Sequence, residues 1–149
     1  MKIIKLLVIN YFCVSCVSIN VNSKKTVSET HKERTKHETF SYKEGDTTYV
    51  MQKYFLVLLK KGTNNNFSKE ELSEIQKKHL AHISWLAKQG YISIAGPSEN
   101  HDSIAGFLLF NTETLKEADS LANLDPAVKA KRFTVETLPW WAAKGSKLK

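Results

Sequence analysis

The chain has 149 residues, of which 42% are hydrophobic and 25% are charged, and its formal net charge at pH 7 is +7. This size and composition suit one globular domain with extensions. The positive charge lies mainly near the two ends, because residues 49–142 contain eleven basic and ten acidic side chains. Nucleic-acid binding needs a clustered basic face, so the nearly neutral central region argues against a nucleic-acid partner.

The first twenty residues, MKIIKLLVINYFCVSCVSIN, place two lysines before an apolar run from Leu6 to Val17. The run is too short to span a bilayer in the mature protein, and the pattern is typical of a secretory signal peptide, assigned to residues 1–22. The alternative is a bacterial lipoprotein with its lipid on Cys16, although Cys13 stands where leucine is usual. We therefore expect a secreted or periplasmic protein, which contacts a membrane after signal removal only if Cys16 carries a lipid.

Residues 23–48 are rich in Lys, Glu, Thr and Ser and poor in apolar side chains. Such a segment cannot bury enough apolar surface to offset the entropy lost on ordering, so we expect a flexible polar linker. The folded domain is expected at residues 49–142, and a basic tail at residues 143–149.

The expected domain reads as alternating strands and helices. Its first strand, residues 49–61, is rich in Tyr, Val, Phe and Leu. A helix follows at residues 69–89, because Ser68 and Glu71 have the spacing of a capping box and Gly90 is a natural C-terminal stop. The later elements are predicted as strands at 91–97, 104–111 and 131–138, and as a helix that begins after Thr114, with Glu117 completing a second capping box, and ends near Asp125.

The order β-α-β-β-α-β predicts a two-layer α+β sandwich of the ferredoxin-like kind. The helices would cover one face of the sheet. The other face has no partner within the chain, so we expect a second copy to cover it in a homodimer, with Trp140 or Trp141 at the interface.

His79 lies in the middle of the apolar face of the first predicted helix. At about 100° per residue, four apolar residues fall within about 40° of it: Leu72, Ile75, Ile83 and Leu86. A buried imidazole needs hydrogen-bond partners, or it costs a few kcal/mol. Two interpretations stay open, namely a core histidine bonded to a backbone carbonyl and a functional side chain.

Asp125 is the second unusual residue, because a carboxylate at the end of a helix opposes the helix dipole. It precedes Pro126, so a turn-forming role is one interpretation. In the predicted sandwich the two helices lie side by side on the sheet. A contact between Asp125 and His79 is therefore geometrically allowed, although the spacing alone does not establish it.

The segment HLAHISWLAKQGYISIAGP, followed by a strand, a helix and LDP, resembles the YCII-related domain family. The resemblance covers residues 49–141, and its residues are His79-Leu80, Gly90, Ala95-Gly96-Pro97, Asp125-Pro126 and Pro139-Trp140. It implies a dimeric α/β barrel, in which two ferredoxin-like units pack sheet to sheet. It also implies an active site with a His-Asp pair, here His79 and Asp125. Some relatives act on lactones, as chloromuconolactone dehalogenases do, and for many members no reaction is known.

Three functions are compatible with these residues. In the first, His79 is the general acid/base of a lyase- or isomerase-like enzyme for a lactone- or carbonyl-type small molecule, and Asp125 orients its ring. In the second, a non-catalytic module binds a small ligand in the same cleft, next to Gly96, Pro97 and Trp85. In the third, a dimeric structural protein uses His79 only for packing.

A metal site is not expected from the histidine spacing. His79 and His82 lie three residues apart, but no third ligand is evident. We therefore expect neither a metal nor another cofactor.

Overall fold

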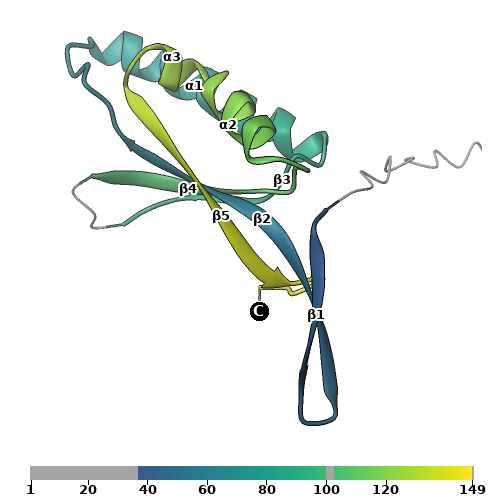
Figure 1. Ribbon diagram of the computed structural model, residues 1–149. Helices are drawn as coiled ribbons and strands as arrows, with labels where there is room; N and C mark the ends of the chain where they lie inside the picture. Colours follow the sequence, from purple (N-terminus) through teal and green to yellow (C-terminus); the bar gives the residue numbers. More distant parts are fainter. Residues whose placement is uncertain (1–36, 100–102, 149) are drawn as a thin grey trace, which may run out of the picture. The chain divides into compact units, whose positions relative to one another are not determined.

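A computed structural model describes residues 37–99 and 103–148, which form five strands and three helices (Figure 1). The predicted signal peptide, residues 1–22, and residues 23–36 of the predicted linker lie outside the described residues. Within the described part of the chain, no helix is long and apolar enough to cross a membrane.

The strands form one antiparallel sheet around β2 (Thr47–Lys61). Along its C-terminal half, β2 pairs with β5 (Phe133–Ala143) on one side and with β4 (Ile104–Phe110) on the other. The remaining central strand, β3 (Ile92–Pro97), pairs with β4. The order β5-β2-β4-β3, with helices between β2 and β3 and between β4 and β5, is the ferredoxin-like arrangement. The predicted fold class is therefore confirmed.

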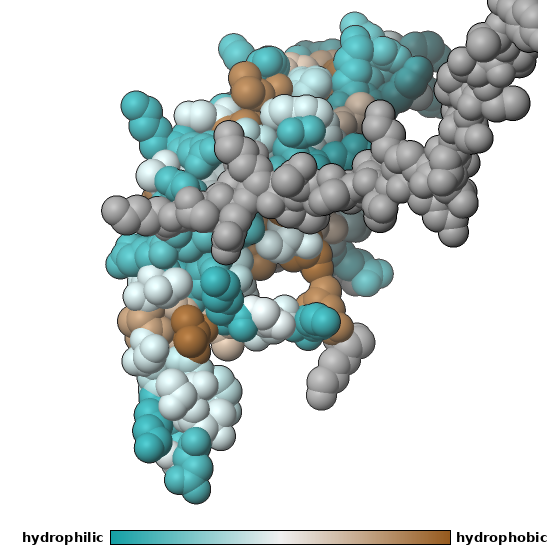
Figure 2. All heavy atoms as spheres, turned by 90° about the vertical axis from the view of Figure 1, so that its right-hand side faces the viewer, coloured by the Kyte–Doolittle hydropathy of each residue, from teal (hydrophilic) through white to brown (hydrophobic). Residues whose placement is uncertain are grey.

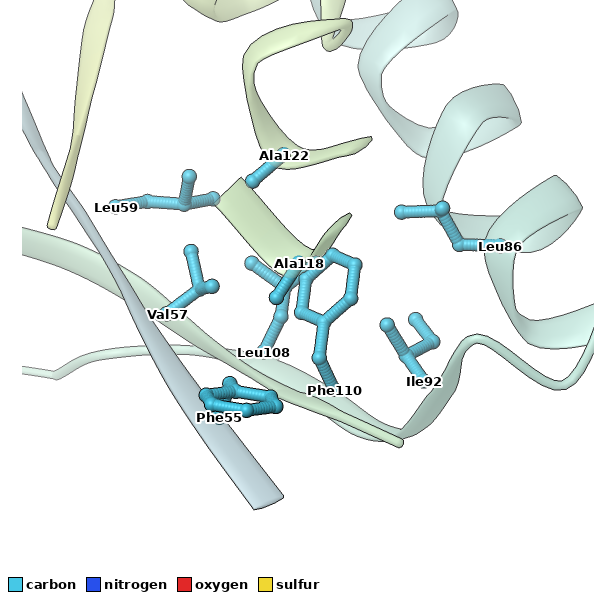
Figure 3. Close-up of a cluster of buried hydrophobic side chains, with 9 residues drawn as sticks. All are labelled: Phe55, Val57, Leu59, Leu86, Ile92, Leu108, Phe110, Ala118 and Ala122. Carbon is cyan, nitrogen blue, oxygen red and sulfur yellow. The ribbon is translucent and has the colours of Figure 1, made fainter. Parts of the chain in front are cut away.

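One face of this sheet carries the hydrophobic core. Strand alternation and register put Phe55 and Val57 of β2 on the same side as Phe110 and Leu108 of β4. Figure 3 shows these residues facing side chains from the helices, and the whole cluster comprises Phe55, Val57, Leu59, Leu86, Ile92, Leu108, Phe110, Ala118 and Ala122. The core thus lies between the sheet and the helical layer.

The first helix, α1 (Lys69–Lys88), begins with the predicted capping box. The Ser68 hydroxyl accepts a hydrogen bond from the Glu71 N–H at 3.1 Å, and the Ser68 N–H donates to the Glu71 carboxylate at 2.7 Å. Gly90 follows with a φ of +72°, the left-handed conformation that favours glycine after a helix. The beginning and the end of α1 are therefore both encoded locally.

The environment of Asp125 differs from the prediction. The second helix, α2 (Leu115–Asn123), stops before this residue, and Asp125 caps the N-terminus of α3 (Pro126–Lys129). Its Oδ1 atom accepts a hydrogen bond from the Ala127 N–H at 2.7 Å. The carboxylate therefore stands at the start of a helix, where the helix dipole favours a negative charge. The predicted conflict between Asp125 and the dipole of the preceding helix was wrong.

The predicted flexible linker is corrected over residues 39–48. The structure places β1 (Thr39–Glu44) in a hairpin with the start of β2, joined by a turn in which Gly45 has a φ of +58°. Tyr42 stands opposite Tyr49, and their rings stack with centroids 5.8 Å apart. Such cross-strand pairs stabilise a ribbon whose outer part is hydrophilic or intermediate in hydropathy (Figure 2). The average composition of residues 39–48 is that of a linker, and it does not reveal that these residues pair across two strands.

The last strand is longer than predicted. We expected it to end at Leu138, but β5 continues through Pro139, Trp140 and Trp141 to Ala143. Among the described strands β5 pairs with β2 alone, so Pro139 stands on an edge strand, where a missing N–H is tolerated.

Candidate functional site

An open cleft of about 750 Å³ lies between α1 and the strands β3 and β4. This volume is in the range of small-molecule binding sites. The lining is largely apolar and comes from α1, from the loop before α1, from the sheet and from the start of β5; it includes Phe67, Leu72, Leu80, Ile83, Pro97 and Phe133. His79 also lines the cleft. The cleft therefore offers an apolar surface to a ligand beside one titratable ring.

The structure brings the two predicted catalytic residues together. His79 Nδ1 lies 2.6 Å from Asp125 Oδ2, and the residues are only 7% and 2% exposed. Because Oδ1 of the same carboxylate accepts the Ala127 N–H, both of its oxygens have a donor. The aspartate is thus held by the start of α3 while it holds the ring on α1.

This hydrogen bond fixes which nitrogen of His79 carries a proton. An ionised carboxylate only accepts, so Nδ1 must donate and a neutral ring keeps its lone pair on Nε2. Within the described part of the chain, Nε2 has no hydrogen-bond partner, and it is not among the fully enclosed polar atoms. Because His79 lines the cleft and its Nδ1 is bonded to Asp125, Nε2 is the ring nitrogen left for a ligand there.

The arrangement suits proton transfer. The Nε2 lone pair can take a proton from a bound molecule, and the neighbouring carboxylate then stabilises the imidazolium that forms. Phe133 meets the His79 ring edge-on, with centroids 5.6 Å apart. The aspartate and the phenyl ring together restrict how the imidazole turns.

Two of the three predicted ligand-binding residues lie at the cleft. Gly96 and Pro97, at the end of β3, are part of its lining. The third, Trp85, is outside the cleft lining, contrary to the prediction. It stacks on His82 with ring centroids 5.9 Å apart and also contacts Tyr91. At about 100° per residue Trp85 is about 120° from His79 around α1, which places it on another side of the helix.

His82 has a role in joining the helices. Its Nε2 donates to the Leu121 carbonyl of α2 at 3.1 Å, whereas His79 is bonded to Asp125. The two histidines therefore turn to different partners. In the described residues, no group of three or more His, Cys, Asp and Glu side chains comes together in a way that could hold a metal ion.

Sequence reasoning missed the polar end of the cleft. Lys61, Asn64, Gln76 and Arg132 all contribute to its lining. The Arg132 guanidinium donates to the Gln76 side-chain oxygen at 2.7 Å. Gln76 stands one turn before His79 on α1, so helical spacing could have predicted that it lies at the cleft. No spacing in the sequence predicts that Arg132 lies next to α1.

A close backbone contact places Arg132. The Gly62 N–H donates to the Arg132 carbonyl at 2.7 Å, and the Asn64 N–H donates to the Lys131 carbonyl at 3.1 Å. A Cβ atom on Gly62 would lie 2.0 Å from the Lys131 carbonyl oxygen, so only glycine fits. Lys131 itself has a φ of +60°, which is uncommon for a residue with a side chain. The chain thus turns sharply just before β5 and presents Arg132 to the cleft.

Part of this chain matches a known protein family. The family model for the YCII-related domain matches residues 54–141, more than half of the 149 residues. No match was found among the curated proteins. One similar solved structure is 5-chloro-2-hydroxyhydroquinone dehydrochlorinase (TftG) from Burkholderia phenoliruptrix AC1100 in complex with 2,5-dihydroxybenzoquinone, with 23% identity and a TM-score of 0.42 over 58% of this chain and 92% of that chain. The family match, together with the fold, shows that this chain belongs to the YCII-related domain family.

Proposed function

We propose that this protein is a small-molecule enzyme in which His79 performs acid/base chemistry on a lactone- or carbonyl-type substrate. The observation that carries the proposal is the 2.6 Å contact between His79 Nδ1 and Asp125 Oδ2 beside an open cleft. A histidine that only packed in the core would have no reason to leave Nε2 accessible. The buried carboxylate keeps that nitrogen available as a base.

The reaction begins when Nε2 removes a proton from the carbon next to the carbonyl group. The electron pair of the broken C–H bond moves into an enolate, and the imidazole becomes an imidazolium next to Asp125. The imidazolium then returns the proton to another carbon, which is an isomerisation, or the enolate expels a leaving group, which is an elimination. Such a positioned proton transfer contributes about 10²–10⁴-fold in rate.

Hydrogen–deuterium exchange tests this step without knowledge of the natural substrate. A panel of unsaturated five-membered lactones is incubated with the protein in D₂O, and deuterium at the carbon next to the carbonyl is followed by ¹H NMR against a protein-free sample. We expect exchange with wild-type protein and its loss in His79→Gln. The matched control is His82→Gln, on the same helix but bonded to the Leu121 carbonyl, which should keep exchange.

The alternative function is a non-catalytic module that binds a small ligand in the same cleft. It is supported by the apolar lining and by the size of the cleft, neither of which requires chemistry. Binding of panel members without any exchange in the wild-type protein would favour this alternative and reject the enzyme.

We also propose a homodimer formed through the sheet face that no described helix covers. Strand alternation puts apolar residues on this face, including Leu56 opposite both Leu109 and Leu138. Leu138 and Trp140 are 38% and 45% exposed. Sedimentation should show a dimer for the wild-type protein and a monomer for Leu138→Lys, whereas Leu124→Lys on the helical layer should stay dimeric. A wild-type monomer at micromolar concentration would contradict the proposal.

Export is proposed from the sequence of residues 1–22. The apolar run after two lysines supports cleavage of a signal peptide. Mass spectrometry of the exported protein should show a chain shortened at its N-terminus. A lipid mass on Cys16 would favour the lipoprotein alternative, and a full-length mass would contradict both.

A further inference from the structure

The polar end of the cleft is positively charged. Among the described lining residues, Lys61 and Arg132 are cations and none is an aspartate or a glutamate. We infer that the cleft takes a small organic carboxylate, whose charged group is bound by Arg132 with Lys61. The carbon skeleton packs on the apolar lining. This inference names the substrate class of the site, and its catalytic meaning rests on the proposed function.

Lys61 and Arg132 are not neutralised by a carboxylate within the described part of the chain. Arg132 gives one hydrogen bond to the neutral Gln76 side chain, and its guanidinium carbon lies 4.9 Å from the centroid of the Phe133 ring. A guanidinium has five N–H donors, so several remain to bind a carboxylate with two parallel hydrogen bonds.

Arg132 is also held in place before any ligand arrives. The backbone contact between Gly62 and Arg132, the Gln76 side chain and the Phe133 ring all restrain it. Arg132 is half-buried, so its charge is screened less than that of a fully exposed side chain. Lys61 is exposed and contributes a second, more mobile positive charge at the cleft. Solubility alone does not require a restrained arginine, whereas recognition of an anion does benefit from one.

The polar end of the cleft is connected to the proposed base, His79, through Gln76 and Phe133. Gln76, which holds Arg132, lies one helical turn before His79 on α1. The Phe133 ring contacts both the guanidinium and the His79 imidazole, at centroid distances of 4.9 Å and 5.6 Å. A carboxylate bound at Arg132 therefore keeps its carbon skeleton in the cleft that His79 also lines. The cations also oppose the cost of a negative enolate formed there.

A pair of isosteric probes tests the charge preference. Benzoate and benzamide have nearly the same shape, but only benzoate is an anion at neutral pH. Each is titrated into ¹⁵N-labelled protein, and dissociation constants are taken from NMR chemical-shift changes at the cleft. We expect benzoate to bind about tenfold or more tightly than benzamide, as charge-assisted hydrogen bonds imply. Equal affinities in the wild-type protein would overturn the inference.

Charge variants assign the preference to residues. Arg132→Gln should bring the two affinities to within about twofold, Arg132→Lys should keep part of the preference, and Lys61→Gln should weaken it. Lys88→Gln is the control, because it removes the same charge from the exposed last turn of α1, outside the cleft lining. If Arg132→Gln does not fold by circular dichroism, the exposed Lys61 variant still decides the test. A preference unchanged in every variant would overturn the assignment.

The two proposals can fail separately. Binding needs no turnover, so His79→Gln should keep the preference for benzoate while deuterium exchange is lost. Discrimination between the probes without exchange on any panel member would retain the anion site and reject the enzyme. Exchange on neutral lactones, together with equal affinities for benzoate and benzamide, would retain the enzyme and reject the anion site.

Discussion

His79 Nδ1 lies 2.6 Å from Asp125 Oδ2, although 46 positions separate the two residues in the chain. The same aspartate caps α3 through its other oxygen. Burying such a pair costs desolvation energy that their attraction does not reliably recover, so stability alone is a weak reason for its presence. The accessible Nε2 gives the better reason, which is proton transfer to a ligand in the cleft.

Asp125 variants separate orientation of the ring from support of α3. Asp125→Asn keeps a side-chain oxygen for the Ala127 N–H but lacks the charge that stabilises an imidazolium. We expect the fold to remain and the deuterium-exchange rate to fall about a hundredfold. Asp125→Ala also removes the cap, so urea titration should show a free energy of unfolding lower by about 1–3 kcal/mol. An Asp125→Asn protein with the wild-type rate would contradict the role.

Two leucines on α1 distinguish the core from the cleft. Leu86 is 0% exposed in the core, whereas Leu80 is 52% exposed and lines the cleft. Leu86→Ala should lower the free energy of unfolding by about 2–5 kcal/mol, because it leaves a cavity. Leu80→Ala should change it by about 0.5 kcal/mol or less and weaken the binding of apolar ligands. Similar losses of stability in both variants would show that the cleft is not open.

Two glycines offer a matched test of the contact that places Arg132. A Cβ atom on Gly62 would lie 2.0 Å from a backbone oxygen, whereas a Cβ atom on Gly96 would meet nothing within 4 Å. Gly62→Ala should therefore lower the free energy of unfolding by about 1–3 kcal/mol and weaken benzoate binding, since the backbone must shift. Gly96→Ala should leave stability nearly unchanged. Thermal melts and NMR titration check both, and a neutral Gly62→Ala would remove the explanation for the turn.

The capping box of α1 predicts a pH dependence. Hydrogen bonds from the Ser68 backbone and side chain lower the pKa of Glu71 from its ordinary value of 4.5. Because the folded-state pKa is the lower one, this stabilisation is present above the unfolded value and is lost as pH falls through the folded value. Glu71→Gln should therefore lower the melting temperature at neutral pH, and the difference from wild type should shrink by about pH 3. A difference that grows in acid would contradict the assignment.

Much of the fold follows from patterns a few residues long. Ser68 and Glu71 mark the start of α1, Gly90 marks its end, and runs of apolar residues mark the central strands. These signals gave the β-α-β-β-α-β order and placed His79 on the inner face of its helix. They are readable because backbone hydrogen bonds and caps join residues that are close in the chain.

Two of the errors share one cause. The pairing of Tyr42 with Tyr49 and the extension of β5 past Pro139 each depend on which strands meet, and strand pairing is decided by such contacts when local preferences are weak. Composition alone therefore made residues 39–48 look like a linker. The capping of α3 by Asp125 is local instead, because the Ala127 N–H that it binds is two positions away, but the Asp-Pro pair was interpreted as the end of a helix.

For this protein, patterns readable along the chain establish the order of the four central strands and of α1 and α2, and they place His79 within an apolar stripe. The contact of Asp125 with that imidazole and the position of Arg132 at the same cleft arise only in the folded chain. Both depend on chain segments folded against each other, in one case α3 against α1 and in the other Gly62 against the turn before β5. Close packing between distant segments sets such geometry, and no short stretch of sequence contains it.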